Sequence, residues 1–133
     1  MNNIDYKTWR LIDANLNRLK EGIRVIEDIA RYLNDDASLA LRLKNIRHLC
    51  KIDNYIEVIK SIDSQNDVLK TSIESEMQRS NISSILIANY KRTQESARVL
   101  EEILKILNPK LSEKFKNIRY ELYTLEKENL TLN

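Results

Sequence analysis

The sequence contains very few of the residues that interrupt helices: its 133 residues include one Gly and one Pro. Both residues are common in the tight turns that connect β-strands, so their scarcity favours an all-α protein. A single Gly also excludes the glycine-rich loops with which Walker-type NTPases and protein kinases bind phosphates through backbone N–H groups. Any phosphate bound by this chain must therefore be held by side chains.

Cysteine and long apolar runs are equally scarce. Cys50 is the only cysteine, so the chain can form no internal disulfide and no second thiol can help to bind a metal ion. Its apolar neighbours Leu49 and Ile52 predict that Cys50 belongs to the core. No run of about eighteen apolar residues occurs, and the N-terminal MNNIDYKTWR has no hydrophobic secretory region. We expect a cytoplasmic protein with no membrane partner.

Charge of either sign is not in excess. The chain has 22 basic and 20 acidic residues, a net charge of +2, and the two signs are mixed along its length. This balance does not indicate a nucleic acid or an anionic membrane as partner. At 15.7 kDa the chain is long enough to bury a core without a disulfide or a metal ion, and residues 1–133 are predicted to form one domain.

What the sequence does have is helical periodicity. Apolar residues recur at steps of three and four in four stretches, 6–33, 39–50, 82–107 and 111–125. Asp36 is predicted to cap the second helix, and Ser80 or Asn81 the third. Asn108-Pro109 should end the third helix, because proline disfavours helical geometry in the preceding residue. We expect the second helical pattern to continue to about residue 60, either unbroken or with a break near Asp53-Asn54, and the C-terminal ENLTLN to fray.

Two stretches of the sequence are close copies of each other. Residues 15–34 (NLNRLKEGIRVIEDIARYLN) and 89–108 (NYKRTQESARVLEEILKILN) are identical at nine of twenty positions with an offset of 74. Further on, LKNIRH at 43–48 recurs as FKNIRY at 115–120 with an offset of 72. The copies predict an antiparallel helical bundle of two related hairpins, about 6–60 and 82–128, joined by a connecting segment at about 61–81.

The repeat has polar residues at positions that are predicted to be buried. On a helical wheel Asn15 and Arg18 fall inside a broad apolar arc that includes Val25, and Asn89 and Arg92 occupy the matching positions. A buried guanidinium must meet a carboxylate or an anionic ligand, because an unpaired buried charge costs several kcal/mol. One interpretation pairs each Arg with a nearby carboxylate, such as Glu21 or Glu95. The other makes the arginines clamps for phosphate oxygens in a cleft shared by the hairpins.

Other polar residues are less specific. Arg47 and its repeat Arg119 are predicted to lie at the surface, although they could extend a basic lining. His48 is the only histidine, and packing or hydrogen bonding is the alternative to a catalytic role. Asp63 and Asp67 offer the oxygen ligands that Mg²⁺ prefers, although aspartates in a polar segment often serve only solubility.

The repeated blocks resemble a known family. DANLNRLKEGIRVIEDIAR at 13–31, LKNIRH at 43–48, the segment with Asp63 and Asp67-Val68, and NYKRTQESARVLEE at 89–102 are similar to a small helical domain of thiamine biosynthesis. That domain often precedes thiamine-phosphate synthase in fused proteins. The family pattern has Arg before the first aspartate and Gly after Asp-Val, where this chain has Ile62 and Leu69, and this difference weakens any role for the segment.

The resemblance implies hydroxymethylpyrimidine phosphate kinase activity. ATP, with Mg²⁺, would phosphorylate 4-amino-5-hydroxymethyl-2-methylpyrimidine phosphate to its pyrophosphate, which the synthase would use. The candidate catalytic residues are Glu21, Glu95 and His48. The candidate substrate- or phosphate-binding residues are Asp13, Asn15, Arg18, Arg24, Glu27, Arg47, Asn89, Arg92 and Arg98. The candidate metal ligands are Asp63 and Asp67.

A second hypothesis needs no chemistry. The chain could be a non-enzymatic helical module, a homodimer or the subunit of a complex, whose repeated polar residues fix pairing. Residues 1–133 contain no synthase barrel, so synthase activity is not expected of them. Sequence alone leaves open the oligomeric state and which hairpin binds ATP.

Overall fold

The computed structural model describes residues 6–53 and 81–131. Its elements are α1 (Tyr6–Asp28), a π-helical turn (Ile29–Leu33), α2 (Ala37–Leu49), α5 (Ile82–Leu107) and α6 (Pro109–Thr131). These ranges contain no β-strand, and the all-α prediction is confirmed. Residues 54–80, which include the end of the predicted first hairpin and almost all of the connecting segment, lie outside the described residues.

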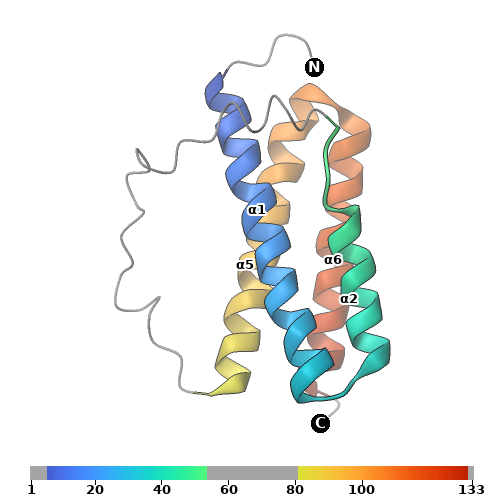
Figure 1. Cartoon of the computed structure of the whole chain (residues 1–133). Helices are drawn as coiled ribbons and strands as arrows, with labels where there is room; N and C mark the ends of the chain where they lie inside the picture. Colours follow the sequence, from blue (N-terminus) through green and yellow to red (C-terminus); the bar gives the residue numbers. More distant parts are fainter. Residues whose placement is uncertain (1–5, 54–80, 132–133) are drawn as a thin grey trace.

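Helices α1, α2, α5 and α6 form an antiparallel bundle. In Figure 1, α1 and α6 run down the molecule while α2 and α5 run up it. Helix α1 packs against α2 and α5, and α5 packs most extensively against α6. The predicted antiparallel bundle is thus confirmed. None of the helices in the described ranges combines the length and the apolar character needed to span a bilayer.

Polar side chains cap three of these helices. The side chains of Asp36 and Asn108 each accept a hydrogen bond from the backbone N–H three residues later, at 3.1 and 3.3 Å. Asn81 and Ser84 form a reciprocal capping box at the start of α5, with N···O distances of 2.8 and 3.1 Å. The caps predicted at Asp36 and Asn81 are confirmed, and α5 ends just before Asn108-Pro109 as expected.

The first hairpin differs from the second at its turn. The N–H of Asn34 bonds to the carbonyl of Ile29 at 3.0 Å, so the last turn of this helix is π-helical, and Asp35 has a positive φ of 48°. Residues 34–36 separate the helices here, whereas Asn108 alone separates α5 from α6. This accounts for the two-residue change of offset between the matching helices.

Helices α1, α2, α5 and α6 all contribute to the core of the described part of the chain. Ile23 of α1, Leu43 of α2, Leu100 of α5 and Phe115 of α6 are fully buried, and each such side chain contributes about 1.5–3 kcal/mol. Cys50 is buried just after α2, as predicted.

The only glycine of the chain allows α1 and α5 to approach closely. A Cβ added to Gly22 would lie 2.6 Å from Cγ2 of Thr93 and 3.5 Å from the carbonyl oxygen of Asn89. Gly22 therefore has a packing role inside a helix, and no phosphate loop surrounds it.

One helix ends before the break that its sequence pattern allowed near Asp53-Asn54, and another extends beyond its predicted end. Helix α2 ends at Leu49, because the backbone of Cys50 leaves the helical region at ψ 73°. Helix α6 continues to Thr131, so residues 128–131 of the C-terminal segment are helical rather than frayed. Leu130 packs partly against the core, which explains the additional turn.

Candidate functional site

The two arginines expected inside the bundle are exposed. Arg18 and Arg92 lie on the outer surfaces of α1 and α5, and neither has an ion-pair partner among the described residues. Val25 and Val99, which widened the predicted apolar arc, are themselves 38% and 37% exposed. The arc on the helical wheel was drawn too broadly, and the prediction that both arginines are buried is wrong.

The asparagines of the repeat lie deeper. Asn15 is buried, as predicted, and Asn89 is half-buried. Each side-chain amide donates to the backbone carbonyl four residues earlier in its own helix, at 2.9 Å in both cases. The same local hydrogen bond thus recurs at matching positions in α1 and α5.

The buried charges are at different repeated positions from those expected. Glu27 of α1 accepts from Arg47 of α2 at 2.7 Å, and Glu101 of α5 accepts from Arg119 of α6 at 2.9 Å. Both glutamates are buried, because they lie on the flank of their helix that faces the next helix of the hairpin. The surface role predicted for Arg119 is wrong, and Arg47 is half-buried.

Surface ion pairs recur as well. Arg24 pairs with Asp28 at 3.3 Å, and Arg98 pairs with Glu102 at 3.0 Å, four residues apart on exposed helix faces. Such pairs contribute about 0.3–0.5 kcal/mol. They replace the pairs of Arg18 and Arg92 with nearby glutamates that the structural interpretation predicted, neither of which occurs among the described residues.

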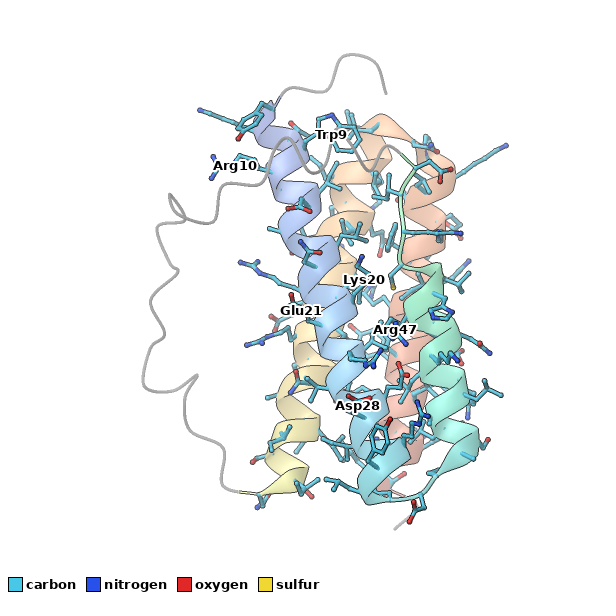
Figure 2. All side chains as sticks on the ribbon, viewed as in Figure 1. Trp9, Arg10, Lys20, Glu21, Asp28 and Arg47 are labelled. Atoms are coloured by element: carbon cyan, nitrogen blue, oxygen red, sulfur yellow. The ribbon has the colours of Figure 1, made fainter. Side chains whose placement is uncertain are left out.

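A basic pocket lies between α1 and α2. Its volume is about 430 Å³, and its lining consists of Lys20, Glu21, Arg24, Arg47, His48, Cys50 and Lys51. Figure 2 shows Lys20 on α1 and Arg47 on α2, on the sides of these helices that face each other. The lining brings together four cationic side chains, one histidine and one carboxylate, which is a composition suited to anionic ligands.

Four predicted site residues line this pocket: Glu21, Arg24, Arg47 and His48. Glu27 adjoins it through its ion pair with Arg47. The other described candidates do not line it: Asp13, Asn15, Arg18, Asn89, Arg92, Glu95 and Arg98. Arg98 instead lies beside a separate apolar pocket of about 360 Å³ together with Leu11, Val99, Glu102 and Ile103. Asp63 and Asp67 lie outside the described residues, so their proposed metal role stays a prediction.

Lys20 and Lys51 are pocket residues that sequence reasoning missed. Lys20 aligns with Gln94 in the repeat, and Lys51 aligns with Tyr123. A comparison that selects only identical positions of the repeat therefore cannot find either lysine. The signal that could have found them is the opposite one, a charge present in only one of two similar hairpins.

The inner end of the pocket combines burial with positive charge. Burial raises the pKa of the Cys50 thiol to about 12, although Lys114, Lys20 and Arg47 each act to lower it. These three cations belong to three different helices. Nζ of Lys114 donates to the backbone carbonyl of Lys51 at 3.2 Å, and burial lowers the pKa of Lys114. Helix α6 thereby anchors the segment that carries Lys51.

The corresponding region of the second hairpin has other chemistry. The amide of Gln94 donates to Glu126 at 3.0 Å. The rings of Tyr120 and Tyr123 meet edge to face at 6.1 Å, with the guanidinium of Arg119 4.8 Å from the Tyr120 ring centroid. Aromatic rings and a neutral amide thus stand where the first hairpin has His48, Lys51 and Lys20.

A carboxyl group outside the pocket is also perturbed. Burial raises the pKa of Asp13, against the opposing hydrogen bond from Nδ2 of Asn17 at 3.2 Å. In residues 6–53 and 81–131 no three His, Cys, Asp or Glu side chains are close enough to hold a metal ion together. Glu21 is the carboxylate that the pocket lining itself supplies.

Fold and pocket together define a small helical protein with a basic pocket between the two helices of its first hairpin. A model of the ThiD2 family matches residues 10–128, and the chain belongs to this family. The family resemblance predicted from the repeated blocks is confirmed by this match.

Curated relatives extend the comparison. A thiamine-phosphate synthase of Prochlorococcus marinus subsp. pastoris is 40% identical over 97% of this chain, and that of Rhodopirellula baltica is 36% identical over 96% of it. A thiamine-phosphate synthase of Nostoc punctiforme is 37% identical over 89% of the chain. The alignments cover 34–37% of these relatives, so the chain spans about a third of their length. No solved structure matches the chain.

Proposed function

We propose that the chain is a phosphotransferase of thiamine biosynthesis that converts 4-amino-5-hydroxymethyl-2-methylpyrimidine phosphate to its pyrophosphate. An oxygen of the substrate phosphate attacks the γ-phosphorus of ATP, the bond from that phosphorus to the bridging oxygen breaks, and ADP leaves. The product would be a substrate for thiamine-phosphate synthase, the name carried by the curated relatives. Family membership supports this function.

The basic pocket between α1 and α2 is the observation that carries the proposal. Phosphoryl transfer depends mainly on positioning and on neutralisation of charge, and both substrates present several anionic oxygens. Gly22 is packed against α5, so side chains rather than a glycine loop must supply the cations. The pocket supplies them from both helices of one hairpin.

The roles of individual residues follow from their contacts. Arg47 is held by two hydrogen bonds to Glu27, at 2.7 and 3.3 Å, so its guanidinium is fixed before a ligand arrives. The attacking phosphate oxygen is already ionised at neutral pH, so the reaction needs no strong general base. His48, at the exposed edge of the pocket, would serve as a hydrogen-bond donor to a phosphate oxygen.

Mg²⁺ fits the pocket through Glu21. Magnesium is commonly held by one or two carboxylates together with substrate phosphates, and Glu21 lines the pocket without an ion-pair partner among the described residues. When bound, the ion would neutralise charge on the phosphate oxygens.

The decisive experiment is turnover. The purified chain is incubated with Mg-ATP and the pyrimidine phosphate, release of ADP is followed by a coupled assay, and the pyrophosphate product is identified by mass. We expect ADP and product in equal amounts. No turnover above background, while another family member is active in the same assay, would remove the kinase proposal and favour the non-enzymatic module.

A further inference from the structure

We propose that the pocket between α1 and α2 is a phosphate-binding site in which Lys20 and Lys51 hold the anion between them, and that the second hairpin has no equivalent site. This deepens the proposed function, on which it rests only for the identity of the natural ligand. The chemical class of the ligand is a phosphate or pyrophosphate group.

The charges available to a ligand identify these two lysines. Arg24 is paired with Asp28, and Arg47 is paired with Glu27, so both guanidinium charges are already balanced by carboxylates. Lys20 and Lys51 line the same pocket, and neither ammonium group has an ion-pair partner among the described residues. An anion that enters the pocket therefore meets two ammonium groups that are in no ion pair, with Glu21 as the carboxylate of the lining and Asp13 acting on Lys20 through its charge.

The two lysines of the pocket lining come from different parts of the first hairpin. Lys20 is half-buried on α1, and Lys51 follows the end of α2. The backbone of Lys51 is tied to α6 by Lys114, which makes it part of the packed bundle. Lysine is a compact point charge with three donors, so two lysines in one pocket can bind a dianion without the fixed geometry that arginine requires.

The arginines of the pocket complete the site. Both Arg24 and Arg47 line the pocket, and a guanidinium paired with one carboxylate keeps N–H donors free for a second acceptor. Arg47 is the better placed of the two, because Arg24 is exposed on the surface of α1. We assign Glu27 as a positioning residue that fixes the direction of Arg47.

The second hairpin provides an internal control for this assignment. It retains the buried pair of Glu101 with Arg119 and the surface pair of Arg98 with Glu102. Neither free lysine is present: Gln94 is bonded to Glu126, and Tyr123 packs on Tyr120. A site that depended only on the repeated arginines would occur twice, whereas a site that depends on the lysines occurs once.

The test is binding of inorganic pyrophosphate, measured by isothermal titration calorimetry at low ionic strength with neither ATP nor pyrimidine present. We expect one site per chain. Lys20→Gln and Lys51→Tyr, which introduce the residues of the second hairpin, should each weaken binding at least tenfold, and Lys20→Arg should keep it within about threefold of wild type. Lys44→Gln is the matched control, because it removes an exposed lysine of α2 that does not line the pocket, and we expect less than a twofold change.

Thermal unfolding of each variant is measured in parallel, and unchanged melting temperatures assign a loss of binding to the site. No binding by wild type, unchanged affinity in Lys20→Gln and Lys51→Tyr, or an equal loss in Lys44→Gln would each overturn the site. Single-site binding that depends on both lysines, in a chain without kinase activity, would support the site and reject the proposed reaction. Full turnover and unchanged KM values in both lysine variants would support the proposed reaction and reject the site.

Discussion

The two hairpins of this bundle share several packing and surface contacts but differ in the residues at the positions of the pocket. Both have a buried Glu–Arg pair between their helices, an Arg–carboxylate pair on the surface and an Asn bonded to its own helix. The first adds Lys20, His48 and Lys51, whereas the second has Gln94, Tyr120 and Tyr123 at the matching positions. The shared residues explain how each pair of helices packs, and the different residues indicate where a ligand binds.

Removal of the carboxylate from each buried ion pair should show the largest difference in lost stability between the two hairpins. Arg119 is 9% exposed in its side chain, whereas Arg47 is 20% exposed and opens onto the pocket. Glu101→Gln leaves a buried cation without a counter-ion, and we expect it to lower the free energy of unfolding by about 3 kcal/mol. Glu27→Gln should cost about 1 kcal/mol, because Arg47 can reach water. Urea unfolding at pH 7 measures both, and an equal or larger loss in Glu27→Gln would contradict this difference.

Cys50 should make the stability of the protein sensitive to alkaline pH. The matching residue of the second hairpin, Leu122, does not ionise and adds no such sensitivity. The pKa of Cys50 is raised to about 12 in the folded protein, so the unfolded thiol ionises first as pH rises. The stabilising effect of the neutral thiol is complete below about pH 9 and is lost between about pH 9 and 12, at up to about 1.4 kcal/mol per pH unit.

We expect the stability of wild type to fall more steeply than that of Cys50→Ala over this range, in urea unfolding under reducing conditions. The difference between the two curves isolates the thiol from the lysines and tyrosines that titrate in both proteins. Parallel curves would show that Cys50 is not the group responsible.

The contact between α1 of the first hairpin and α5 of the second can be disturbed by a substitution at Gly22. Gly22→Ala places a methyl group 2.6 Å from Cγ2 of Thr93, a stiff β-branched side chain that is fully buried. Overpacking costs about 1–3 kcal/mol, and the higher helix propensity of Ala returns about 1 kcal/mol, so we expect a net loss of about 1 kcal/mol.

The matched control for Gly22→Ala is the double variant Gly22→Ala with Thr93→Ser, which removes the clashing methyl group. Thermal unfolding should show that Thr93→Ser costs less when it is combined with Gly22→Ala than when it is made alone in wild type. Strictly additive losses would mean that the two helices do not meet through these atoms.

Removal of the helix caps should show the smallest difference in lost stability between the two hairpins. Asp36 and Asn108 cap α2 and α6 with similar hydrogen bonds, so Asp36→Ala and Asn108→Ala should each cost about 1 kcal/mol. Chemical unfolding of the two variants side by side tests this equality. A loss confined to one of them would show that the two hairpins do not begin their second helices in the same way.

Local features of the fold could be predicted from the sequence, whereas pairing between helices could not. The helices, the cap at Asp36 and the end of α5 before Pro109 depend on neighbouring residues, so periodicity and capping rules were sufficient. The partner of Glu27 is twenty residues away on another helix, and a helical wheel of α1 alone cannot identify it. The π-helical turn, which changes the register of the first hairpin, left no clear pattern in the sequence.

The candidate site was predicted only in part, and for a physical reason. Repetition selected Arg18 and Arg92, but residues kept in both halves also maintain surfaces and packing, and these two arginines proved to be exposed. Glu21, Arg24, Arg47 and His48 do meet in one pocket. Lys20 was missed because its importance lies in its difference from Gln94.

The most direct test of the central claim is to map pyrophosphate binding on the protein by the backbone amide shifts of its NMR spectrum. The account predicts that the largest shifts occur around residues 20–24 and 47–51, with little change in the matching segments 94–98 and 119–123. Equal shifts in both pairs of segments, or the largest shifts in the second hairpin, would contradict it.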